Sequence, residues 1–277
     1  MNLFAVSRTA NTMIPAQHEV AREQFCGNSN QFYANAYKDN GKLVVNQKGN
    51  QLSFNSGNIS GVFQTKQGKF ISYKMNNTSL LSSFPEPYFW RAPTDNDFGN
   101  QMPQKLSFWR NAHLLLQLDS VVVHQQNDEG LLIDCMYKMQ ATDMPYTITY
   151  QLLNNGAIKV TASMQVKKNW QELPRFGMRM QMPLTYEQIN FYGRGPWENY
   201  SDRKTAAFVG LYEQKTADQF VANYIRPQEN GYKTDIRWVS LFDENKNGIT
   251  ITGVQPICFS ALPYTTEDLD PGNTKKQ

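Results

Sequence analysis

Cysteine and histidine are scarce in this chain of 277 residues, which contains only three of each. The cysteines, Cys26, Cys135 and Cys258, are far apart, and no two of them have CxxC spacing. This distribution predicts neither a disulfide framework nor a zinc site, and the histidines lack an HExxH context. We therefore expect no metal ion or other cofactor within this chain. The alternating apolar residues around Cys135 predict a small buried side chain at that position.

Excess charge of one sign and long hydrophobic runs are also lacking. The 27 basic and 24 acidic residues leave a formal net charge of +3, and no stripe of Lys or Arg predicts a nucleic-acid partner. No run approaches the ~18 apolar residues that would predict a membrane span. The first eight residues show no secretory signal, which leaves a cytoplasmic and a periplasmic location both open. The 40% hydrophobic and 13% aromatic content predicts a sizeable folded core.

Alternation of apolar and polar residues dominates the pattern. In residues 157–166, Ile158, Val160 and Ala162 fall on one face and lysine, threonine and serine on the other. The preceding Asn154-Asn155-Gly156 predicts a turn that joins this strand to residues 146–153 as a hairpin. Further strands are predicted at 19–25, 42–47, 51–55, 62–66, 70–75, 115–124, 131–140, 176–183, 206–212, 234–242 and 249–252.

Helical periodicity is confined to residues 104–112, where Leu106, Trp109 and Ala112 fall on one face. Many short strands with one short helix predict an all-β antiparallel sandwich. Trp90 and Trp109 are interpreted as core residues.

The run from Phe89 to Asn100 is the most informative in the chain. Arg91, Asp95, Asn96 and Asp97 can all hold hydroxyl groups, and they follow two aromatic residues. Planar charged or amide groups beside aromatic faces are typical of carbohydrate sites. An internal arginine–aspartate pair that locks a loop explains the same residues. If extended, Asp95 and Asp97 would share a side, with Cβ atoms roughly 7 Å apart.

A second polar run extends from Tyr192 to Arg203. Gly193-Arg194-Gly195-Pro196 predicts a tight turn that directs the following polar groups into one place. These groups are either a sugar-facing or domain-facing wall, or an ion-pair cluster of Arg194 or Arg203 with Glu198 or Asp202. Trp197 suits a sugar ring or a domain interface. The candidate residues of this run are Arg194, Glu198, Asn199, Tyr200, Asp202 and Arg203.

Together with Pro227-Gln228-Glu229-Asn230-Gly231, these runs resemble the C-terminal domain of family 2 β-galactosidases, which is the small chain of their two-subunit relatives. The resemblance implies a large antiparallel supersandwich akin to galactose mutarotase. It implies a retaining parent enzyme whose catalytic carboxylates, and any Mg or Na ions, lie in other domains. This chain would be non-catalytic and would support assembly with those domains and with other subunits of a homo-oligomer. Any contact with galactosides would be weak or indirect. Glu229 and Asn230 join the candidate residues.

The resemblance also suggests boundaries. Residues 1–26 would be the remnant of a preceding immunoglobulin-like domain, followed by a linker at Gly27–Asn30. Residues 27–277 would be the supersandwich, truncated before a tryptophan-bearing segment that reaches the galactose site in relatives. Two other functions stay open. One is an autonomous galactoside-binding module; the other is a mutarotase-like epimerase with Glu198 or Glu229 as base, for which neither His113 nor His124 lies in a matching acid motif.

Overall fold

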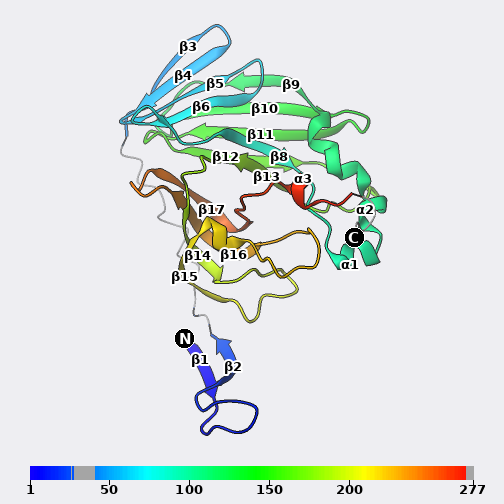
Figure 1. Cartoon of the computed structure of the whole chain (residues 1–277). Helices are drawn as coiled ribbons and strands as arrows, with labels where there is room; N and C mark the ends of the chain where they lie inside the picture. Colours follow the sequence, from blue (N-terminus) through cyan, green and yellow to red (C-terminus); the bar gives the residue numbers. More distant parts are fainter. Residues whose placement is uncertain (26, 28–40, 273–277) are drawn as a thin grey trace. The chain divides into compact units, whose positions relative to one another are not determined.

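The computed structural model describes residues 1–25, 27 and 41–272 (Figure 1). Cys26, residues 28–30 of the predicted linker and the tail from 273 lie outside the described residues. Contacts divide the chain into two compact units. Unit 1 comprises residues 1–37, 185–224 and 230–264, and unit 2 comprises residues 38–184, 225–229 and 265–277. Among the described residues, no helix has both the length and the apolar character that crossing a membrane requires.

Unit 2 contains two larger antiparallel sheets, whose strands are drawn side by side in Figure 1. The first has the order β3-β4-β5-β6-β7: Val44–Lys48, Gln51–Ser56, Ile59–Gln64, Lys69–Met75 and Thr78–Ser79. The second has the order β12-β11-β10-β9: Ile158–Met164, Met144–Leu152, Leu131–Met139 and Leu116–Val123. A two-stranded sheet pairs β8 (Ser83–Tyr88) with β13 (Gly177–Gln181).

The core of unit 2 lies where the inner faces of these sheets meet. Phe63 and Phe70 of the first sheet contact Tyr150 of the second, with ring centroids 5.7 and 5.2 Å apart. Cys135, Trp90 and Trp109 are fully buried in the same cluster. The edge-to-face ring geometry is the favoured arrangement for aromatic pairs. The predictions of an all-β sandwich, of core tryptophans and of a buried Cys135 are confirmed.

The predicted helix at 104–112 is wrong in form. The chain makes a one-turn helix α2 (Met102–Lys105) and then a 3-10 helix η1 (Ser107–Leu115). Trp109 and Ala112 are buried as predicted, whereas Leu106 is partly buried at the junction. The three-residue spacing from Leu106 to Trp109 to Ala112 suits the 3.0-residue turn of a 3-10 helix. Two further short helices, α1 (Asp95–Gly99) and α3 (Thr266–Leu269), belong to unit 2.

Unit 1 contains one four-stranded antiparallel sheet in the order β15-β14-β16-β17. These strands are Phe208–Lys215, Gln188–Gly195, Lys233–Phe242 and Gly248–Phe259. The 3-10 helix η2 (Thr216–Gln219) follows β15. The hairpin of β1 (Asn2–Val6) and β2 (Glu19–Gln24) also belongs to this unit. The Gln24 side chain both donates to Val209 O (2.8 Å) and accepts from Val209 N (2.7 Å), so the hairpin is attached to the edge strand β15.

Most predicted strands are present within a few residues of their expected ends, and Gly156 has the predicted positive φ of 85° between β11 and β12. The patterns at β1, β7, β8 and β14 were not predicted as strands. β8 carries two prolines and β14 two glycines, which disfavour a strand prediction. The prediction of a turn at 193–196 is therefore wrong in its first part, because Gly193, Arg194 and Gly195 end strand β14.

Candidate functional site

The first polar motif folds around the start of helix α1, in unit 2. Thr94 is the N-cap: its hydroxyl accepts a bond from Asp97 N (3.4 Å), and Asp97 Oδ2 accepts one from Thr94 N (2.8 Å). This reciprocal capping box satisfies amide groups that a helix start otherwise leaves unpaired. Asp97 is 5% exposed, and Arg91 approaches it with two nitrogens, at 2.5 and 2.7 Å. The two-point contact fixes the guanidinium plane as well as its charge.

Helix α1 separates the two aspartates that an extended chain would have placed on one side. Asp97 is buried against Arg91, whereas Asp95 and Asn96 are exposed at the helix surface. The idea of an extended Asp95/Asp97 pair is therefore wrong, because the capping box makes the segment helical. Burial alone would raise the pKa of Asp97, but its bonds from Arg91 and Thr94 outweigh burial and hold the pKa below 3.8. Asp97 stays ionised at neutral pH and is unsuited to act as a general acid.

Glu229, from the third motif, joins the Arg91–Asp97 pair in unit 2. Its carboxylate is 7% exposed, lies 3.5 Å from Arg91 Nη1 and accepts a short bond from Arg175 Nη2. Its backbone N–H donates to Ala92 O (3.3 Å). Two arginines therefore face two buried carboxylates, which leaves the cluster without net charge. Such pairing is what burial of charge requires, because an unpaired buried charge is strongly destabilising.

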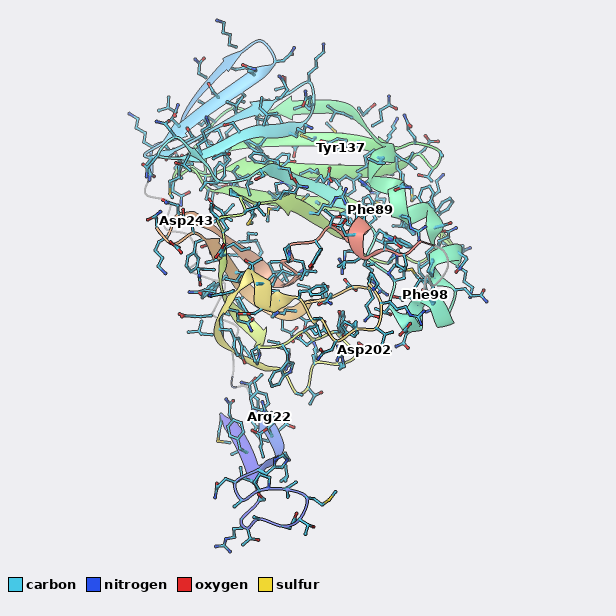
Figure 2. The ribbon with its side chains drawn as sticks, viewed as in Figure 1. Arg22, Phe89, Phe98, Tyr137, Asp202 and Asp243 are labelled. Atoms are coloured by element: carbon cyan, nitrogen blue, oxygen red, sulfur yellow. The ribbon has the colours of Figure 1, made fainter. Side chains whose placement is uncertain are left out.

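The second motif forms a separate cluster in unit 1, centred on Glu198. Its carboxylate is 8% exposed and accepts bonds from Arg203 Nη2 (2.8 Å), Gly231 N (3.0 Å) and the Tyr224 hydroxyl. The hydrogen bond to Glu198 raises the pKa of Arg203. Burial raises the pKa of Tyr224, and the hydrogen bond to Glu198 raises it further. Of the ion pairs that the sequence allowed, Arg203 with Glu198 is the one that forms. Asp202 lies exposed on the loop after β14 (Figure 2).

Asn199 and Asn230 hold backbone segments of unit 1. Asn199 is 1% exposed; its Oδ1 accepts from Thr234 N (3.1 Å) and Oγ1 (2.6 Å), and its Nδ2 donates to Arg194 O and Trp197 O, each at 3.2 Å. Asn230 makes a two-point contact with the backbone of Val221. Four bonds satisfy each hydrogen-bonding group of Asn199, so this amide serves as a fixed part of the loop.

Arg194 is paired, but with a residue that the sequence did not indicate. It donates from Nε to Asp235 Oδ2 (2.6 Å) and from Nη1 to Ala207 O (2.8 Å). Lys204 contacts the same carboxylate at 3.2 Å. Asp235 has φ of 54° and lies at an irregularity between β16 and β17. Gly193 is required beside it, because a Cβ there would lie 2.7 Å from Ile236 Cα.

The aromatic residues of the second motif lie nearer the surface. Tyr200 stacks on Tyr232 with centroids 5.5 Å apart and an interplanar angle of 18°, and Arg203 lies over its ring. Trp197 is 47% exposed, with the guanidinium of Arg22 5.4 Å from its ring centroid. Figure 2 shows Arg22 on the hairpin β1–β2. Trp197 therefore contacts the N-terminal hairpin of its own unit and keeps a large apolar surface.

Lys233 is a buried cation that the sequence analysis missed. It is 2% exposed, donates from Nζ to Gln219 Oε1 (2.5 Å), and lies 5.6 and 6.0 Å from the ring centroids of Phe191 and Phe259. Burial lowers its pKa to about 8, an effect that the charge of Glu198 partly offsets. Its position two residues after the third motif, at the start of an otherwise alternating strand, was the available signal. Arg175, Tyr224 and Asp235 carried no comparable signal, because their partners are 26 or more residues away.

The predicted site residues therefore fall into two sets. Arg91, Asp97 and Glu229 meet in unit 2, and Glu198, Asn199 and Arg203 belong with Arg194, Tyr200 and Asn230 to unit 1. Asp95, Asn96 and Asp202 are exposed. Within the described ranges, no group of three or more His, Cys, Asp or Glu side chains has an arrangement that could hold a metal ion. What both sets provide is rigid ion pairing and loop anchoring.

Comparison with known proteins identifies the family. The family profile described as Beta galactosidase small chain matches residues 55–277. The chain is 35% identical to a β-galactosidase of Priestia megaterium over 92% of its own length and 24% of the relative, and 30% identical to one of Lactobacillus delbrueckii subsp. bulgaricus over 84% and 23%. It is also 27% identical to the β-galactosidase small subunit of Latilactobacillus sakei, over 76% of this chain and 74% of that subunit.

The chain thus spans about a quarter of the first two relatives and 74% of the small subunit of Latilactobacillus sakei. The matched region contains all three polar motifs. The recognised resemblance is confirmed, and this chain belongs to the β-galactosidase small chain family.

Proposed function

We propose that this chain is the non-catalytic small-chain part of a family 2 β-galactosidase, a retaining hydrolase of terminal β-galactosides such as lactose. Its role is to complete the enzyme by contacting the catalytic part and other subunits, and to support the architecture around the sugar site. The names of the relatives support the parent activity, and the small subunit of Latilactobacillus sakei supports assembly with a larger partner.

The observation that carries the non-catalytic role is the pairing of the buried carboxylates. Hydrolysis with retention needs one carboxyl group as acid/base and another as nucleophile, about 5–5.5 Å apart. Asp97 and Glu229 are each held by arginines, and Glu198 accepts three donors. A nucleophile must have a lone pair directed at substrate, whereas these carboxylates are buried and directed at their own protein donors. Supporting a loop is the chemistry that suits them.

Exchange of the matching segments tests the contribution to the parent enzyme. The β-galactosidase of Priestia megaterium would be prepared with its matching segment deleted, and with that segment replaced by this chain. We expect the deleted enzyme to lose hydrolysis of nitrophenyl β-galactoside and the chimera to recover it. Full activity of the deleted enzyme would overturn the proposal. The chimera carrying Asn96→Ala, at an exposed position, is the matched control for Arg91→Ala and Glu198→Gln.

The non-catalytic role needs a separate test on the chain by itself. At micromolar concentration, the chain should hydrolyse nitrophenyl β-galactoside no faster than buffer. Hydrolysis that disappears in Asp97→Asn, Glu198→Gln or Glu229→Gln would contradict the non-catalytic role, because it would place the reacting carboxylates in this chain. Mutarotation of α-galactose followed by polarimetry would distinguish the epimerase alternative in the same samples.

A further inference from the structure

A pocket in unit 2 has none of the ion-paired residues of the Arg91 cluster in its lining. It has a volume of about 210 Å³ and is formed by three segments: the end of β8, the helix η1 and the terminal segment around α3. The lining residues are Tyr88, Trp90, Arg110, Asn111, Thr266, Glu267, Asp270 and Gly272. None of them belongs to the three sequence motifs apart from Trp90, which precedes Arg91. Neither the family description nor the names of the relatives assign a ligand to it.

The charged groups of this pocket are fixed in place. Asp270 Oδ2 accepts from Trp90 Nε1 (2.8 Å) and Arg110 Nε (3.0 Å), and its Oδ1 accepts from Gly272 N (2.9 Å). The guanidinium of Arg110 lies 4.9 Å from the ring centroid of Trp90. With side-chain exposures of 23% and 9%, Arg110 and Asp270 form a partly buried pair. A ligand would meet groups that are already ordered, which reduces the entropy lost on binding.

Glu267, a second carboxylate of the lining, is also anchored. Glu267 accepts a bond from Arg179 Nη1 (2.5 Å), and Arg179 also donates to Glu86 (2.7 Å). The Arg179 guanidinium lies 4.1 Å from the ring centroid of Tyr88, whose hydroxyl is 3.5 Å from Glu267. The terminal segment is therefore bound to β8 and β13 through charge-assisted contacts, which are shorter and stronger than neutral ones.

The composition of the lining selects a class of ligand. Both signs of charge are present and paired, so an ionic ligand would have to compete with Asp270 for Arg110 or with Arg179 for Glu267. A hydroxyl group can instead donate to a carboxylate and accept from an amide or guanidinium at once. Tyr88 and Trp90 are 4% and 0% exposed and lie beneath the guanidinium groups of Arg179 and Arg110, so they support the polar lining from below. At about 210 Å³ the space is below the range of drug-sized sites, which begins near 300 Å³.

We propose that this pocket is a binding site for one neutral monosaccharide or a polyol of similar size. It is independent of the hydrolysis proposed above, because its lining contains none of the candidate catalytic or motif carboxylates. Its recognition groups are Glu267, Asn111 and the Arg110 guanidinium, which buried Asp270, Tyr88 and Trp90 help to hold in place.

The test is a titration of the full 277-residue chain with D-galactose, D-glucose and glycerol, followed by amide and indole N–H shifts in NMR. We expect saturable shifts with a millimolar Kd for at least one hexose at Asn111, Gly272 and the Trp90 indole. Asn111→Phe, at an exposed position, should fill the opening and weaken binding at least tenfold. Asn96→Phe, also at an exposed position but on helix α1, should bind as the unmodified chain does.

Each contrary result overturns a defined part of the proposal. Shifts that are absent or unsaturable at 100 mM of all three probes overturn the site, provided that both variants and the unmodified chain give folded spectra. Equal binding by Asn111→Phe, or shifts confined to residues 194–203, places the sugar elsewhere. Tighter binding of inorganic phosphate than of hexose overturns the neutral class of ligand. Loss of galactosidase activity in the chimera, by itself, does not bear on this pocket.

Discussion

The buried cation Lys233 gives the sharpest prediction about stability. Lysine in water has a pKa near 10.5, and burial lowers that of Lys233 to about 8. Because the folded state binds the proton less tightly than the unfolded state, protonation of Lys233 opposes folding. The penalty is largest below pH 8 and is relieved as the pH rises from 8 towards 10.5.

The size of the effect follows from the two pKa values. Proton linkage gives a penalty of about 3 kcal/mol at pH 7 and about 1 kcal/mol at pH 9.5. Lys233 therefore adds about 2 kcal/mol to the free energy of unfolding between these pH values, or a rise in Tm of roughly 4–8 °C for a domain of this size. Two groups stabilise the charged form of Lys233 and so limit this penalty. Glu198 supplies an opposite charge, and Gln219 supplies a hydrogen-bond acceptor at 2.5 Å.

Lys233→Met removes the charge while keeping the length of the side chain between Phe191 and Phe259. We expect the variant to lack this pH-dependent gain of about 2 kcal/mol. At pH 7 it should be more stable by 1–2 kcal/mol, since the lost bond to Gln219 costs about 1 kcal/mol of the benefit. Urea unfolding of both proteins at half-unit steps from pH 7 to 9.5 measures the difference, with Lys159→Met on the exposed face of β12 as control. Parallel stability curves for the unmodified chain and Lys233→Met would refute the reasoning.

Four other changes test the polar clusters. Arg91→Ala should lower the free energy of unfolding by about 3 kcal/mol, because buried Asp97 loses its two-point partner; an unchanged Tm would contradict this. Asp97→Asn should reduce the loss of stability on acidification. The lowered pKa of Asp97 contributes stability that is present above pH 3.8 and is lost as the pH falls through the pKa of the folded state. Acid titration followed by circular dichroism checks this. Asn199→Ala should cost about 2 kcal/mol in chemical denaturation, against a negligible change for exposed Asn96→Ala. Gly193→Ala should cost about 3 kcal/mol or prevent folding, because its Cβ would lie 2.3 Å from Ile236 Cδ1; normal stability would show that β16 can shift.

The fold was largely predictable because the sandwich depends on local alternation. β10 and β11 place alternate residues in the core, and the Asn154-Asn155-Gly156 turn joins β11 to β12 in register. β14 escaped prediction because its two glycines pack against Ile236 and Phe191, and this reason for glycine is visible only in three dimensions. The division of the chain into two contact units could not be predicted from the sequence either, because unit 1 combines three separate stretches of sequence.

The candidate sites show a different limit of prediction from the sequence. Residue chemistry identified the polar clusters but did not give their partners, because Arg175, Tyr224 and Asp235 approach from distant segments. One local signal did exist. Thr94 followed three residues later by Asp97 is a helix-capping pattern with Asp in place of the usual Glu or Gln. Its recognition would have predicted helix α1 and would have separated Asp95 from Asp97.

Polar residues gathered in a short motif are ambiguous because ligand binding and internal pairing use the same groups. Burial decides between them in this chain. Asp97, Glu198 and Glu229 are each below 10% exposed and are held by protein donors, so a sugar could reach them only by displacing those donors. In the pocket beside Trp90, by contrast, Glu267 keeps a side-chain exposure of 58% after pairing with Arg179. A carboxylate that is both fixed and accessible can bind a hydroxyl group without breaking an ion pair. For this reason the sugar titration should perturb the pocket residues and leave the amide signals of Asp97, Glu198 and Glu229 in place.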